Sequence, residues 1–146
     1  MKLYITNSDG EIPEFLTVSP LRGNCVRNID NDIAANSECD EIIVDCIDYI
    51  PVTYLYSSIQ NYVQKLAKKG KITIKGQDIY LLALNITKRN LDIGQINYLI
   101  YGGPAANQLK MSVVSIQELT AILESLKIKI TKKQIDGINY IIEGIK

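Results

Sequence analysis

A strand, a long amphipathic helix and a second strand follow one another in mid-chain, and this order constrains the fold most. Residues 41–46 (EIIVDC) hold three consecutive branched apolar residues, the pattern of a strand covered on both faces. Apolar residues then recur at helical spacing from 53 to 69, and Gly70 follows as a stop signal. Residues 71–75 (KITIK) alternate like a strand that breaks at Gly76. Because such crossovers join parallel strands, we expect a parallel sheet with residues 41–46 near its middle.

Three short β-rich runs precede this unit. Residues 2–6 (KLYIT) predict a strand that ends at a cluster of turn formers, and residues 15–18 predict a second strand that ends before Pro20. Residues 25–29 (CVRNI) predict a third, ended by an Asp-Asn-Asp turn. No clear helix pattern separates the first two strands.

The second half of the chain predicts helices followed by a hairpin. Asp78 can cap one helix, a second helical piece covers 93–101, and Ser115 with Glu118 forms a capping box for a third. Residues 127–130 and 139–145 predict two strands around a link that contains Asp-Gly, which is typical of a hairpin. The chain therefore predicts one α/β domain over residues 1–146, with a mostly parallel sheet closed by an antiparallel C-terminal hairpin.

Composition removes several kinds of chemistry. The chain has no histidine, so a Ser-His-Asp triad, a Cys-His dyad and a His-ligated zinc are excluded. Its three cysteines, Cys25, Cys39 and Cys46, lack CxxC spacing, so we predict neither a disulfide framework nor a metal site. Any proton chemistry must use Asp, Glu, Lys, Tyr or Cys.

Charge and hydropathy disfavour polyanion and membrane partners. Sixteen Lys and Arg residues balance sixteen Asp and Glu residues, so no net field attracts nucleic acid. Lysines cluster between 65 and 75, where a solvated helix end explains them. No apolar run reaches the ~18 residues of a membrane span, and the N-terminus has no signal-peptide pattern. We expect a soluble cytoplasmic protein, and the preference for Lys, Ile and Asn hints at a bacterium or a virus that infects one.

The order of elements, with the motifs below, resembles the class I S-adenosylmethionine-dependent methyltransferases. The likeness is nearest to a small subgroup that reads approximately KLNLGSG, PGWINVD, DEI, LEHIP and GGKL. The corresponding stretches here are residues 2–8 (KLYITNS), 13–19 (PEFLTVS), 40–42 (DEI), 47–51 (IDYIP) and 69–72 (KGKI). The resemblance spans nearly the whole chain and implies a Rossmann-like sheet that binds its ligands at the carboxyl ends of the strands.

This resemblance implies a set of site residues. Asp48 or Tyr49 would be the catalytic base for a hydroxyl acceptor. The family's first loop is rich in glycine and approaches the cofactor, whereas this chain has one glycine there; the family's ribose-binding acid is a serine here. The implied S-adenosylmethionine contacts are Thr6, Asn7, Ser8 and Gly10 in the loop, Ser19 at the ribose, Asp30 or Asp32 at the adenine, and Asp45 at the methionine end.

Two functions follow. One is a methyltransferase whose acceptor is a small molecule, sugar or lipid-linked intermediate. The other is a catalytically inactive methyltransferase-like domain that serves as a binding or structural module, with a protein partner or a second copy of itself. Tyrosines 49, 54, 56 and 62 lie near one predicted strand end and helix start. Core packing would explain most of them, and an exposed tyrosine surface would suit an interface.

Overall fold

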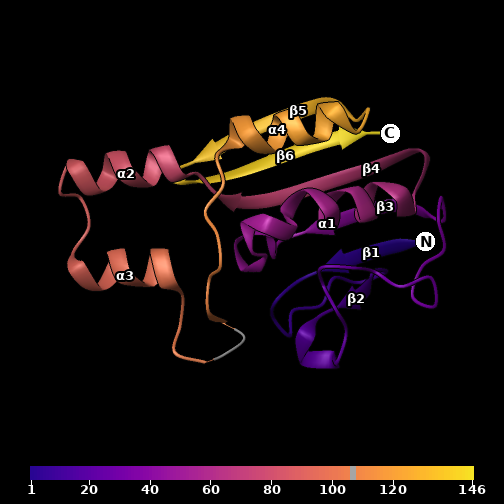
Figure 1. Cartoon of the computed structure of the whole chain (residues 1–146), viewed down its shortest axis with the longest axis horizontal. Helices are drawn as coiled ribbons and strands as arrows, with labels where there is room; N and C mark the ends of the chain where they lie inside the picture. The colour runs from indigo at the N-terminus through magenta and orange to yellow at the C-terminus, as the bar shows by residue number, and fades with distance from the viewer. Residues whose placement is uncertain (106–107) are drawn as a thin grey trace.

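The computed structural model describes residues 1–105 and 108–146, which build a six-stranded sheet in the order β2-β1-β3-β4-β6-β5 (Figure 1). Strands β1 to β4 pair in parallel, whereas β4, β6 and β5 pair antiparallel. The expected mostly parallel sheet with a C-terminal hairpin is confirmed. The strands are β1 (Lys2–Ile5), β2 (Leu16–Val18), β3 (Cys39–Val44), β4 (Leu66–Gln77), β5 (Lys129–Asp136) and β6 (Asn139–Ile145).

Two helices, α1 (Val52–Lys65) and α4 (Ile116–Ser125), lie side by side on one face of the sheet (Figure 1). Two short 3-10 helices, η1 (Pro20–Arg22) and η2 (Ile47–Tyr49), follow β2 and β3. The core fills the space between the helices and the sheet. Its fully buried side chains include Leu3, Ile5, Ile42, Val44, Ile59, Tyr62, Ile72, Ile74, Leu119 and Leu123.

The opposite face of the sheet is polar. Lys2 lies 3.8 Å from Glu41 across β1 and β3, and Lys71 lies 2.8 Å from Glu143 across β4 and β6. Ile43, on this face of β3, is only half-buried. The predicted position of this strand in mid-sheet is confirmed, but the expectation that both its faces are covered is wrong. Segments 6–15 and 19–38 form no α-helix that could cover the second face, which also confirms that no helix separates β1 from β2.

The predicted third strand at residues 25–29 does not form. Its apolar residues Val26 and Ile29 are buried against α1. The Val26 carbonyl accepts a hydrogen bond from the Tyr62 hydroxyl, and the Ile29 N–H donates to Asn61 Oδ1 at 2.7 Å. Helix side chains thus satisfy the backbone groups that a strand would have paired, so short apolar runs need not become strands.

Several boundaries differ from the prediction. Helix α1 ends at Lys65 rather than residue 69, because the chain turns directly into β4 at Leu66. Strand β4 continues through Gly76, the residue expected to break it. Ser115 caps α4 by accepting from the Glu118 N–H, whereas the reciprocal pair of a capping box is recorded at α3 (Ile93–Tyr101), between Asp92 and Gln95.

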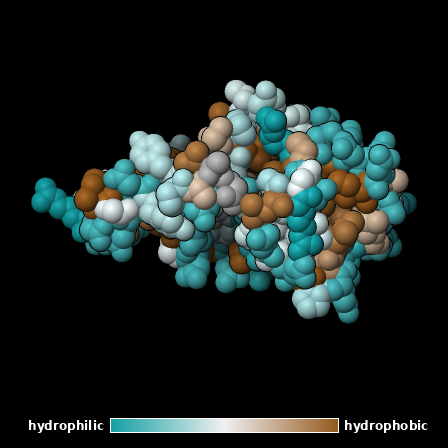
Figure 2. Space-filling model, turned by 90° about the horizontal axis from the view of Figure 1, so that it is seen from below, coloured by the Kyte–Doolittle hydropathy of each residue, from teal (hydrophilic) through white to brown (hydrophobic). Residues whose placement is uncertain are grey.

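Helix α2 (Ile79–Thr87) and helix α3 project beyond the carboxyl edge of the sheet (Figure 1). Figure 2 shows a small group of apolar side chains among hydrophilic ones at this left end of the molecule. Leu82 is the only buried residue of these two helices, and most of their apolar side chains are at least partly exposed. Exposed apolar surface of this kind is typical of interaction sites. Its large apolar and tyrosine side chains are Ile79, Tyr80, Leu84, Ile93, Tyr98 and Tyr101. No helix among the described residues has both the length and the apolar character needed to cross a membrane.

Candidate functional site

Asp45 directly follows β3 at the carboxyl edge of the sheet. The Tyr4 hydroxyl, from β1, donates a hydrogen bond to Asp45 Oδ2. The other oxygen, Oδ1, is buried and has no hydrogen-bond partner among the described residues. A buried carboxylate oxygen without a donor is costly in a folded protein, so Asp45 retains unused capacity to bind a ligand.

Asp48 lies in η2, immediately beyond Asp45, and is largely buried. Its Oδ1 accepts a long hydrogen bond of 3.4 Å from the Gln77 N–H, and its Oδ2 lies 3.8 Å from Lys110 Nζ. Burial raises the pKa of the Asp48 carboxyl, and it lowers the pKa of the Lys110 ammonium. The Asp48 carbonyl accepts from the N–H groups of Met111 and Ser112, which ties this turn to the segment after α3.

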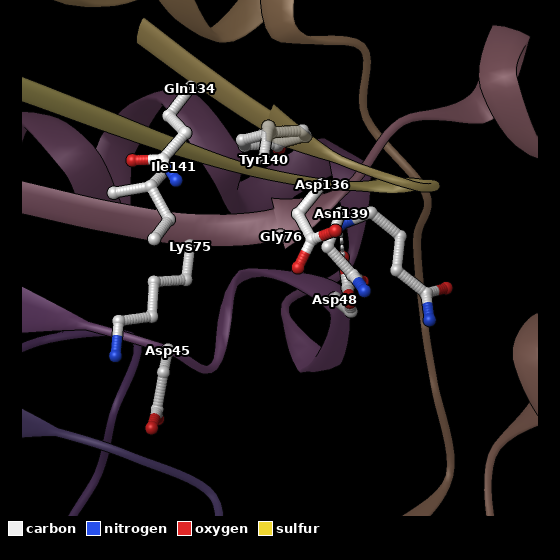
Figure 3. Close-up of a pocket in the computed structure, with 10 residues that line it drawn as sticks. Asp45, Asp48, Lys75, Gly76, Gln134, Asp136, Asn139, Tyr140 and Ile141 are labelled. Atoms are coloured by element: carbon white, nitrogen blue, oxygen red, sulfur yellow. Dashed lines mark hydrogen bonds between the residues drawn. The ribbon is translucent and has the colours of Figure 1, made fainter. Parts of the chain in front are cut away.

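A cavity of about 320 Å³ opens beside these two carboxylates (Figure 3). Two of the residues that line it have a buried polar atom without a partner among the described residues, namely Gln77 Oε1 and the Tyr140 hydroxyl. The cavity is lined by the residue after β3, by η2, by the carboxyl ends of β4 and β5, and by the first residues of β6. Its residues are Asp45, Asp48, Lys75, Gly76, Gln77, Gln134, Asp136, Asn139, Tyr140 and Ile141.

Gly76 brings the Tyr140 ring to this position. A Cβ at residue 76 would stand 2.6 Å from the Tyr140 hydroxyl oxygen, closer than Cβ atoms approach non-bonded atoms in proteins. The glycine therefore permits the hydroxyl to lie beside the strand, near Asp48, and burial raises the pKa of the Tyr140 hydroxyl above its ordinary value. The group is a neutral phenol at physiological pH.

The loop expected to contact the cofactor satisfies its own polar groups. The hydroxyls of Thr6 and Ser8 lie 3.0 Å apart and share a hydrogen bond, and the Ser8 N–H donates to Thr6 Oγ1. The Gly10 N–H donates to Ser8 Oγ at 3.3 Å. Asn7 is half-buried in the same loop. Because the loop does not lead into a helix, it also lacks the helix N-terminus that attracts anionic groups.

Ser19, at the position expected to bind a ribose, is fully buried. Its hydroxyl accepts from the Leu21 N–H at 3.2 Å and caps η1. A single engaged hydroxyl cannot form the paired hydrogen bonds that a carboxylate offers to two ribose hydroxyls.

Asp30 lies at the other edge of the sheet, with Asp32 two residues further along the same exposed turn. Helix α1 runs back from the carboxyl edge to the amino edge, and Asp30 lines a small hollow with Asn61 and Lys65 from its last turns. Asn31 Oδ1 accepts from Lys65 Nζ. The expectation that the predicted aspartates share one crevice is wrong, because residues 25–29 pack on α1 instead of extending the sheet.

Tyr49, the other base candidate, is half-buried in η2 and packs against the core. Burial, with Asp48 nearby, raises the pKa of its hydroxyl. Tyr49 does not line the cavity. Sequence reasoning missed Gln77, Tyr140 and Lys110, since only the pairing of β4 with β6 and the return of the chain after α3 bring them to Asp48.

Solved structures similar to this chain include two methyltransferases. No protein-family model matches the chain, and no curated protein does. A methyltransferase dependent on S-adenosylmethionine from Mesorhizobium loti matches 97% of this chain and 78% of its own, with a TM-score of 0.62 and 7% identity. The 1,6-didemethyltoxoflavin-N1-methyltransferase of Burkholderia thailandensis, solved with S-adenosylhomocysteine, matches 99% and 70%, with a TM-score of 0.61 and 12% identity.

The chain has a class I methyltransferase-like fold. At 7% and 12% identity, the likeness to these two enzymes shows the fold alone. A possible exported protein from Bordetella parapertussis also matches, with a TM-score of 0.55 and 12% identity over 76% of this chain, which spans 40% of that protein. In this methyltransferase-like domain, the positions implied for the nucleoside half of S-adenosylmethionine do not fit it. Ser19 is engaged, the first loop bonds to itself, and Asp30 lies elsewhere.

Because Asp48 is buried, we expect its contribution to the unfolding free energy to fall as pH rises. Its native pKa is raised above the ordinary value of 3.8, so the folded state holds the proton more tightly than the unfolded state between these two values. We expect the unfolding free energy of the wild type to decline relative to that of Asp48→Asn as pH increases from about 3 to about 7. Urea unfolding of both proteins across this range measures the difference.

Glu143 provides a control of opposite sign. Its hydrogen bond to Lys71 lowers the pKa of the Glu143 carboxyl below 4.5, so its contribution is lost as pH falls. The stability of the wild type should therefore rise relative to that of Glu143→Gln over the same range. A parallel response of the two variants would contradict the assignment to Asp48.

Proposed function

We propose that this chain is a catalytically inactive methyltransferase-like module that binds a small ligand at the carboxyl edge of its sheet. The observation that carries the proposal is Ser19, whose buried hydroxyl caps η1 where the family places a ribose-binding acid. The cavity beside Asp45 and Asp48 supports a retained binding role, because it contains buried polar atoms without partners.

The exposed surface of α2 and α3 further supports a role in binding rather than catalysis. Both helices are rich in apolar residues, and three tyrosines, Tyr80, Tyr98 and Tyr101, are at least 63% exposed. Tyrosine is enriched at protein interfaces. A protein partner or a second copy of the chain would suit this surface.

A second candidate function is methyl transfer from S-adenosylmethionine to a small molecule, sugar or lipid-linked acceptor. One observation favours it: Asp48 is a buried carboxyl with a raised pKa that lines a cavity, which suits a general base. The fold is shared with enzymes that use this cofactor. The positions implied for the nucleoside half of S-adenosylmethionine do not fit it, and this mismatch weighs against methyl transfer.

Calorimetric titration with S-adenosylmethionine and with S-adenosylhomocysteine separates the two functions. We expect no heat and no thermal shift at millimolar ligand, because the Ser19 hydroxyl and the Gly10 N–H are already engaged within the chain. Binding at micromolar concentration, worth about 8 kcal/mol, would contradict the proposal and favour the enzyme. In that event Asp48→Asn should abolish turnover, while Glu124→Gln, a change on the exposed face of α4, should leave it intact.

A further inference from the structure

Three residues that line the cavity each have a buried side-chain oxygen atom without a hydrogen-bond partner among the described residues. These atoms are Asp45 Oδ1, Gln77 Oε1 and the Tyr140 hydroxyl oxygen. Gln77 is 7% exposed and Tyr140 is 1% exposed, so bulk water does not satisfy them freely. Native proteins rarely leave buried polar atoms unpaired, and three such atoms in the lining residues of one cavity favour a ligand-binding site there. Since all three can accept hydrogen bonds, the ligand should be rich in donors.

The charge of the cavity favours cationic hydrogen-bond donors over neutral ones. Among the described residues that line it, Asp45, Asp48 and Asp136 oppose a single cation, Lys75. Lys110, 3.8 Å from Asp48, compensates one more carboxylate and still leaves one in excess. A negatively charged, partly enclosed cavity attracts cations more strongly than neutral molecules.

Figure 3 shows the acidic groups at separate places along the cavity. Asp45 lies at one end, with its carboxyl group directed away from the other labelled residues, while Asp48, Asp136 and Asn139 gather near Gly76. A ligand that reaches both ends needs donors at two points. Each protonated primary amine offers three N–H donors.

We infer that this cavity binds a small protonated amine, with ammonium groups directed to Asp45 and to the oxygens of Gln77 and Tyr140. The inference rests on the proposed binding role of the module. It assigns the ligand class by chemistry alone: the groups present accept hydrogen bonds and carry negative charge, and about 320 Å³ accommodates a short aliphatic chain.

The test compares 1,4-diaminobutane with 1,4-butanediol, a neutral molecule of nearly the same shape. In 1H-15N NMR titrations of the full chain at low ionic strength, the diamine should shift the side-chain amide signals of Gln77, Gln134 and Asn139 at millimolar concentration. The diol should leave them in place. Equal shifts with both molecules, or none with either, would overturn the inference.

Variants locate the site. Asp45→Asn keeps an acceptor for the Tyr4 hydroxyl while removing the charge, and it should weaken diamine binding at least about tenfold. Asp136→Asn, an exposed change at the hairpin end that should not disturb folding, should weaken it about twofold to fivefold. Glu124→Gln removes an equal charge from α4 and should have no effect. Uniform weakening by all three variants would mean nonspecific attraction and would contradict the site.

These outcomes are distinct from failure of the proposed function. Micromolar binding of S-adenosylmethionine would contradict the inactive module, whatever the diamine does. Specific binding of the diol without the diamine would leave the binding module standing and replace the amine by a neutral polyol.

Discussion

Asp78→Ala should lower the unfolding free energy by about 3 kcal/mol, because it strips three backbone N–H groups, one buried and two part-buried, of their acceptor. Asp78 Oδ1 accepts from the N–H groups of Tyr80 and Leu81 at the start of α2, at 2.9 and 3.0 Å. Its Oδ2 accepts from the Ile116 N–H at the start of α4, also at 2.9 Å. Asp78 is 2% exposed, so water cannot replace the lost acceptors. Urea unfolding monitored by circular dichroism measures the loss.

Asp92→Ala is the matched control. Asp92 caps α3 through one 2.8 Å hydrogen bond from the Gln95 N–H, but it is exposed and serves one helix. Its replacement should cost about 1 kcal/mol, the ordinary value of an N-cap. Equal losses in the two variants would mean that the link from Asp78 to α4 contributes nothing.

Gly76→Ala should destabilise the fold by about 2 kcal/mol through overpacking. The added Cβ would meet the Tyr140 hydroxyl oxygen at 2.6 Å and its Cζ at 2.8 Å, and β6 holds that ring against β4. The change should also close the cavity and abolish diamine binding, since Gly76 and Tyr140 both line it.

Tyr140→Phe separates the two effects. Removing an unpartnered buried hydroxyl should raise the unfolding free energy by about 1 kcal/mol while weakening ligand binding. When Tyr140→Phe is combined with Gly76→Ala, loss of the hydroxyl should restore part of the stability that the added methyl group costs. The two changes should therefore be non-additive by about 1 kcal/mol. Strict additivity in denaturant titrations would mean that the hydroxyl does not limit the space at residue 76.

The residue pattern predicted the elements well where periodicity was long or capping chemistry was explicit. Helix α1, the Asp78 cap and the terminal hairpin are confirmed, although β5 covers Lys129–Asp136 rather than residues 127–130. It failed at residues 25–29, because a five-residue segment with a few apolar residues is too short to show a periodicity that distinguishes a strand from a packed loop. It also failed at Gly76, because strand pairing on both sides outweighs the low strand preference of glycine.

For the candidate site, the sequence placed Asp45 and Asp48 correctly at the end of β3, since parallel strands bring their carboxyl ends to one edge. It could not foresee that Ser19 caps η1, because local hydrogen bonding competes with ligand contacts only in a given backbone geometry. The sequence also misplaced Asp30, because residues 25–29 pack on α1 instead of forming the predicted third strand.

By itself, the sequence determined the order of elements from residue 41 onward, the parallel middle of the sheet and the exclusion of histidine chemistry, because these follow from periodicity and residue type. Only the tertiary structure decided which polar atoms meet. Gln77 and Tyr140 lie in strands that are far apart in the chain, and the pairing of β4 with β6 places them around one cavity. Long-range pairing follows from the burial of whole strands, and the sequence near either residue does not encode it.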